Sequence, residues 1–242
     1  LEIFTEKLRD PSGELFLESI VSGHVGNLSH LTHFKGRNIE LRVESLPGLV
    51  GNGEVDIVFD NDEVLVQELD FDYGKGKISA SGNIRFLFPY PVFSIKWAVK
   101  NAEVPILRKS QINISGKGEI VGEKTPYLIR GNINILHGSI GESIQDFRKA
   151  SGGIESYSRF IPKKKTLSES EFIEYNLGVN IARPISMQNS LAELYLNGNL
   201  RIFGYSYSPN FSGRIEVVPE KSMFKFKGHE FLLSEGTIDF SS

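Results

Sequence analysis

The chain has 242 residues and a formal net charge of −3, with 40% hydrophobic and 24% charged residues, which is ordinary for a soluble protein. No stretch of about twenty apolar residues occurs, so the sequence predicts no transmembrane segment. The net charge argues against a dominant attraction to nucleic acid or anionic lipid, and the absence of cysteine excludes disulfides, thiolate nucleophiles and cysteine-based zinc sites.

The first hundred residues consist of short segments in which apolar and polar residues alternate. Successive side chains of a strand point to opposite faces, so this alternation predicts β-strands with one apolar and one polar face. Turn-like residues 11–13 precede the first segment, and prolines, glycines and acidic residues separate the later ones. The predicted strands are 15–21, 39–43, 55–59, 69–73, 78–86 and 95–99.

Two polar clusters in this part resemble metal sites. His24, His30 and His33 lie close in sequence, but no carboxylate is spaced to complete a zinc site, and ordinary loop histidines are the better interpretation. The acidic run 60–63 resembles a fragment of a calcium loop but lacks the glycine and the distal glutamate of such a loop. We interpret it as a polar hairpin turn and expect no metal site.

A repeat follows at a constant offset of 82 residues. Stacked strand units of this kind can lengthen a sheet sideways without a fixed size. The first copy consists of Ile112, Ile114, Gly116, Ile120, Gly122, Gly131, Ile133 and Ile135. The second copy consists, in the same order, of Leu194, Leu196, Gly198, Ile202, Gly204, Gly213, Ile215 and Val217.

Residues 141–171 break the alternation with serine, glycine and lysine. This composition buries too little apolar surface to offset the entropy of ordering, so we predict a mobile loop at the sheet edge. The lysines of 163–165 are interpreted as solvated charge, with docking to lipid headgroups as the alternative.

The sequence contains no recognisable catalytic motif. A nucleophile elbow, a phosphate-binding loop before a helix and a His-Glu-x-x-His helix are all missing. The Gly-Lys-Gly runs 74–76 and 116–118 are better explained as glycines in or between strands, since no helix follows them. We therefore predict that the protein is not an enzyme and carries no cofactor.

The alternation is most regular over residues 175–240, which predicts an antiparallel meander. Gly204, Pro209, Pro219, Gly228 and Gly236 separate its strands. The apolar side of such a meander must be covered by a second sheet, by the same sheet curled on itself, or by a foreign apolar ligand. The pattern alone leaves these three alternatives open.

The same stretch carries a family resemblance. The Leu-x-Gly-x-Leu of 196–200, the Phe-x-Phe-x-Gly of 224–228 and the Gly-x-Ile-x-Phe of 236–240 occur in the order and spacing of the TamB C-terminal region. The chain therefore resembles the TamB family, within the wider AsmA-like bridge proteins. It departs from that family at 219–221, where an acidic or glycine turn is usual, and it lacks a further strand-rich segment, so we expect an excised piece of a longer protein.

The resemblance implies an all-β fold, an elongated, curved antiparallel sheet that forms a U-shaped trough with an apolar interior. We expect sheet repeats in 1–140, the loop in 141–171, and a TamB-type meander in 172–242 that continues the same sheet. The residues expected to line a lipid groove are Leu177, Val179, Ile181, Leu194, Leu196, Leu200, Ile202, Phe211, Ile215, Val217, Phe224, Phe226, Phe231, Leu233, Ile238 and Phe240.

The function implied by the resemblance is that of a periplasmic segment of a protein that bridges the two membranes of a diderm bacterium from an inner-membrane anchor. It would bind phospholipid acyl chains and work with an outer-membrane Omp85-family protein (TamA-like). The alternative is a chaperone-like scaffold that helps outer-membrane β-barrel proteins and autotransporters to insert, using an unpaired sheet edge. A purely structural domain whose sheet covers itself is the third hypothesis.

Overall fold

The computed structural model describes residues 8–43, 49–107, 110–141 and 173–241. These residues form one open, curved β-sheet of 14 strands without a helix, which confirms the predicted fold class. The strands are β1 (Leu8–His24), β2 (Asn27–Val43), β3 (Leu49–Asp60), β4 (Glu63–Tyr73), β5 (Gly76–Arg85), β6 (Val92–Leu107), β7 (Ser110–Gly122), β8 (Tyr127–Ile140), β9 (Ile173–Gln188), β10 (Ala192–Tyr205), β11 (Ser208–Val217), β12 (Met223–Phe226), β13 (His229–Leu232) and β14 (Thr237–Phe240).

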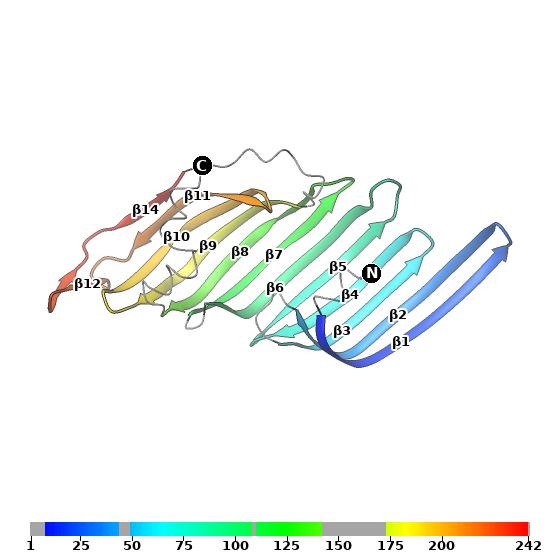
Figure 1. The fold of residues 1–242 in the computed structure, drawn as a ribbon, viewed down its shortest axis with the longest axis horizontal. Coiled ribbons are helices and arrows are strands. Elements are labelled where there is room, and N and C mark those ends of the chain that lie inside the picture. Colours follow the sequence, from blue (N-terminus) through cyan, green and yellow to red (C-terminus); the bar gives the residue numbers. More distant parts are fainter. Residues whose placement is uncertain (1–7, 44–48, 108–109, 142–172, 242) are drawn as a thin grey trace.

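The strand order follows the chain from β1 to β11, as the blue-to-red progression along the sheet in Figure 1 shows. β14 then pairs with β11, while β12 pairs with the beginning of β10 and forms a hairpin with β13. Residues 175–240 are therefore a meander only as far as β11. After β11 the chain makes a short hairpin before it returns to the sheet.

One strand pair differs from the predicted antiparallel arrangement. β8 and β9 are parallel, with Ile133 opposite Val179 and Ile135 opposite Ile181. Parallel neighbours need a connection of a dozen or more residues, because the chain must return to the starting end of the first strand. Residues 141–172 provide that length. Apart from Gly141, the predicted loop lies outside the described residues.

Bulges interrupt the register of several strands and bend the sheet. Asn38, Asn52 and Asn101 have positive φ angles of 52°, 46° and 52°, and each lies beside a register shift. Such bulges increase local twist and curvature. β1 also continues through residues 11–13, which were predicted as a turn. Pro11 and Gly13 lie where the register with β2 shifts, and β1 is an edge strand, so the backbone N–H that proline lacks is not needed for pairing.

Among the described residues, full burial is confined to small groups. The main one consists of Val50, Tyr73 and Ala102, which are 6%, 2% and 0% exposed, with partly buried hydrophobic residues packed around them. Most other apolar side chains of the sheet are half-buried, as expected for a single layer of strands. The sheet therefore leaves much of its hydrophobic surface within reach of solvent or a ligand.

Candidate functional site

The strand register gathers apolar residues on one side of the sheet, which we call the apolar face. Residues directly opposite each other in a sheet share a face, so a row can be followed from partner to partner. One such row crosses nine strands, from β4 to β11 and β14, without a polar residue. Its members are Phe71, Ile78, Val99, Gly116, Ile133, Val179, Leu200, Gly213 and Phe240.

The sequence repeat corresponds to two hairpins with the same register. Ile114 pairs with Ile135 in the β7–β8 hairpin, and Leu196 pairs with Val217 at the equivalent place in the β10–β11 hairpin. The offset of 82 residues therefore relates whole residue pairs rather than single positions. It places equivalent side chains on the same face of the sheet at two points along its length.

The predicted groove residues fall into two groups. Those on β9, β10, β11 and β14 lie on the apolar face in adjoining rows. The remaining four, Phe224, Phe226, Phe231 and Leu233, lie on or just after the β12–β13 hairpin, which contacts β10 only at its beginning. The structure thus brings most of the candidates together and sets these four at one end.

Exposure differs among the candidates. Ile181 is buried, at 7% exposed, whereas Phe211, Phe224, Phe226, Phe231 and Ile238 are exposed. The other candidates are half-buried. Half-buried apolar side chains on an open face are what a ligand-binding floor requires, because they still have surface to bury against a ligand.

Residues of β4 to β8 extend the apolar face but are missing from the predicted set. Phe71, Ile78, Val99 and Ile133 belong to the same row as Val179 and Leu200. The signal was present in the sequence, since the alternation over 69–99 has the same period as that over 175–240. Only the strand register shows that the two parities coincide.

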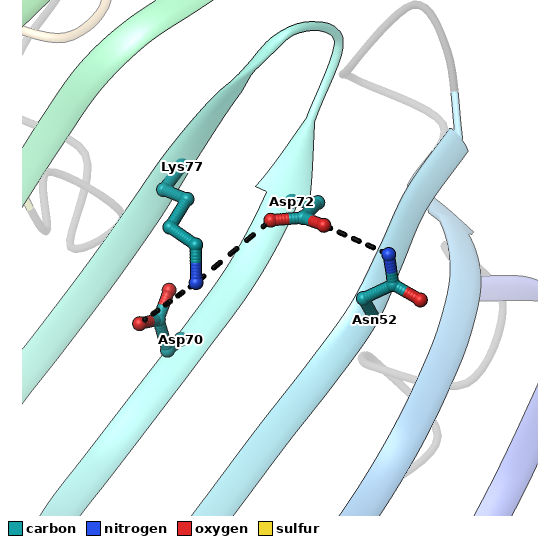
Figure 2. Close-up of polar contacts among 4 residues, drawn as sticks. All are labelled: Asn52, Asp70, Asp72 and Lys77. Atoms are coloured by element: carbon teal, nitrogen blue, oxygen red, sulfur yellow. Dashed lines mark hydrogen bonds and ion pairs between the residues drawn. The ribbon is translucent and has the colours of Figure 1, made fainter.

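The opposite face is polar and is held by contacts between neighbouring strands. Figure 2 shows one group in which Asn52 Nδ2 donates to Asp72 Oδ2 at 2.8 Å and Lys77 Nζ lies 3.4 Å from Asp70 Oδ2. Near the other end, the Arg214 guanidinium contacts Asp239 at 2.6 Å, and this hydrogen bond raises the pKa of Arg214. The two faces therefore differ sharply in chemistry.

The three histidines singled out in the sequence lie in strands β1 and β2 and not in loops as predicted, and one of them has an acidic partner. His33 Nε2 lies 2.6 Å from Asp56 Oδ1, and residues 61 and 62 form the predicted turn between β3 and β4. Within the described residues, no group of three histidine or acidic side chains is arranged to hold a metal ion. Nor does any helix in this part of the chain have the length and apolarity to cross a membrane.

Comparison with known families identifies one match. A family model described as TamB C-terminal domain matches residues 68–242, which begin within β4 and include every strand from β5 onward. Neither a curated protein nor a solved structure matches the chain. The matched region contains the whole apolar row described above.

Proposed function

The chain belongs to the TamB family, because the match to its C-terminal domain spans more than half of the sequence, and from this membership we propose that the apolar face carries phospholipid acyl chains across the periplasm. Membership places the chain in outer-membrane assembly, in a periplasmic region of an envelope protein. The lipid cargo, an anchor in the inner membrane and a TamA-like partner in the outer membrane are parts of the proposal.

The observation that carries the proposal is the row of nonpolar residues from Phe71 to Phe240. Moving two acyl chains of about fifteen methylenes each into water costs on the order of 25 kcal/mol, at about 0.8 kcal/mol per methylene. A floor that stays apolar from strand to strand offsets much of that cost at every position. Because hydrophobic burial is non-directional, a lipid can move along such a floor without a chemical step.

The arrangement of strands favours a foreign occupant over self-coverage. All described strands belong to one sheet, and the strand pairs with substantial contact are close neighbours in it. The apolar side chains of β9 to β11 are mostly half-buried rather than buried. Of the three ways to cover the apolar face, an apolar ligand agrees best with these two features.

A charge placed on the apolar face tests the proposal. Leu200 is half-buried within the row. Because a carboxylate there would have to be buried against acyl chains, Leu200→Asp should stop lipid from copurifying with the protein. The same substitution in the longer protein should fail to complement a deletion strain. Asn199→Asp is the matched control, because it adds a carboxylate one residue away on the polar face. The proposal is wrong if the Leu200→Asp variant retains its fold, its lipid and full complementation.

The scaffold hypothesis is supported by a different feature, the edge strand β1. β1 pairs only with β2 among the described strands, and it extends over 17 residues. An unpaired edge of this kind can accept an added strand from another polypeptide. Crosslinking that captures unfolded barrel protein along β1, with no lipid on the apolar face, would favour a role in protein insertion over lipid transport.

A further inference from the structure

A hollow on the polar face collects positively charged side chains from four strands. The hollow has a volume of about 850 Å³. It is lined by Lys96 of β6, Lys117 of β7, Arg130 of β8 and Arg201 of β10. Among the described residues that line it, the only carboxylate is that of Glu119. The hollow is therefore strongly basic, although the chain as a whole carries a net charge of −3.

Most of this positive charge is not neutralised by the residues that the structure describes. Arg130 is paired with Glu119, at 2.6 Å between Nη2 and Oε1. Within the described part of the chain, Lys96 and Lys117 have no hydrogen-bond or ion-pair partner, and Arg201 donates from Nε to the neutral Asn176 Oδ1 at 3.0 Å. Three cationic groups are thus available to a ligand at one place.

The sheet register explains why a hollow exists there. Asn132, Gly178 and Arg201 are opposite one another on β8, β9 and β10, so the middle strand contributes no side chain between the two longer neighbours. The gap is flanked by the amides of Asn132 and Asn176, which can exchange hydrogen bonds with hydroxyl groups. A volume of this size is within the range of small-ligand sites.

We infer that this basic hollow binds an anionic phosphoester that carries hydroxyl groups, of the glycerophosphate type. Lysine and arginine are the usual partners of phosphate oxygens, and the two asparagine amides suit the hydroxyls. The ligand is either a soluble phosphoester or the headgroup of an anionic phospholipid. Because the hollow lies on the face opposite the apolar row, this inference does not depend on the proposed lipid conduit.

The test is binding of sn-glycerol 3-phosphate to the 242-residue chain by calorimetry, and of the chain to vesicles of phosphatidylglycerol or phosphatidylcholine. We expect saturable binding to at least one anionic probe, weakened by added salt because the site is open to solvent. Binding to glycerol 3-phosphate identifies a soluble ligand, and binding only to phosphatidylglycerol vesicles identifies a headgroup. Binding to neither anionic probe overturns the inference, and so does equal binding to both vesicle types by a chain that does not bind glycerol 3-phosphate.

Two variants separate a specific hollow from general charge. Lys117→Gln combined with Arg201→Gln should weaken binding at least tenfold, whereas Lys75→Gln combined with Lys225→Gln, which removes the same charge from exposed ion pairs elsewhere, should change it less than twofold. Equal losses in the two double variants would contradict the inference.

The second variant is Gly178→Gln, which fills the hollow without changing its charge. A β-carbon there meets only the movable Asn132 side chain closely, at 2.7 Å from Oδ1, so the fold should persist. We expect at least fivefold weaker binding, and unchanged affinity in the folded variant would contradict a ligand seated in the hollow.

Discussion

Trp97 of β6 lies directly opposite Gly118 of β7 and covers it. A β-carbon built at Gly118 would lie 2.5 Å from Trp97 Cζ2, and one built at Gly131 of β8 would lie 2.8 Å from the same atom. The single indole of the chain therefore spreads over two glycines on adjacent strands of the apolar face. Aromatic coverage of strand glycines is a recognised way to stabilise a sheet.

Gly118→Ala should destabilise the sheet because the space for a side chain is already taken. The new methyl group would collide with the Trp97 ring and with the backbone carbonyl oxygen of Arg130. Overpacking of this kind costs about 1–3 kcal/mol of unfolding free energy, measurable by urea denaturation. Gly178→Ala is the control, and equal stability of both variants would contradict this account of the packing.

Tyr127, the first residue of β8, should stabilise the contact between the beginnings of β8 and β6 through its hydroxyl group. The Tyr127 hydroxyl donates to the backbone oxygen of Pro91 at 2.9 Å, and its ring meets Phe93 edge-on, with centroids 4.5 Å apart. Tyr127→Phe removes only the hydrogen bond, so we expect a loss of about 0.5–1.5 kcal/mol. Tyr175→Phe should have no effect, because no described residue bonds the Tyr175 hydroxyl. Equal losses in the two variants would argue against the hydrogen bond.

Asp56 should make stability depend on acid pH. Burial opposes ionisation of its carboxyl group, but hydrogen bonds from His33 and Lys35 and their charges outweigh it and lower the pKa of Asp56 below its ordinary value. A lowered folded-state pKa gives stability that is present above the unfolded-state pKa and is lost as the pH falls through the folded-state value. The loss should therefore begin below about pH 4.

Urea denaturation of Asp56→Asn at pH 5.5 and at pH 3 tests this dependence. The variant should be less stable than the parent at pH 5.5, and the difference should shrink at pH 3. Asp62→Asn, in the exposed turn between β3 and β4, serves as the control. A constant difference between parent and Asp56→Asn across this range would show that the carboxyl group is not stabilised by its partners.

Alternation along the sequence was sufficient to predict that the chain forms β-strands and which residues of one strand share a face, although β1 and β2 extend beyond the predicted segments 15–21 and 39–43. A strand side chain has only two directions, so the parity of Val179 and Leu200 determines their face wherever the strand pairs. The bulges at Asn52 and Asn101 and the parallel β8–β9 pair were not predictable in the same way. They depend on which strands become neighbours, and a local pattern does not contain that information.

The two candidate sites differ in how far the sequence reveals them. The apolar residues of β9 to β11 were found because each strand repeats the same signal. The basic hollow was missed, because Lys96, Lys117, Arg130 and Arg201 are far apart in the chain and each is an ordinary surface cation by itself. Only the register of five neighbouring strands brings them together around Gly178.

The central claim is that acyl chains occupy the apolar face, and photocrosslinking from both faces of the same strands tests it most directly. A photoreactive residue in place of Ile133 or Val179, which lie opposite each other, probes the apolar face. The same residue in place of Asn134 or Asn180 probes the polar face, where the two amides are hydrogen-bonded at 3.2 Å. We predict adducts to phospholipid acyl chains from 133 and 179 and none from 134 or 180. Equal capture of acyl chains on both faces, or polypeptide adducts alone, would contradict the claim.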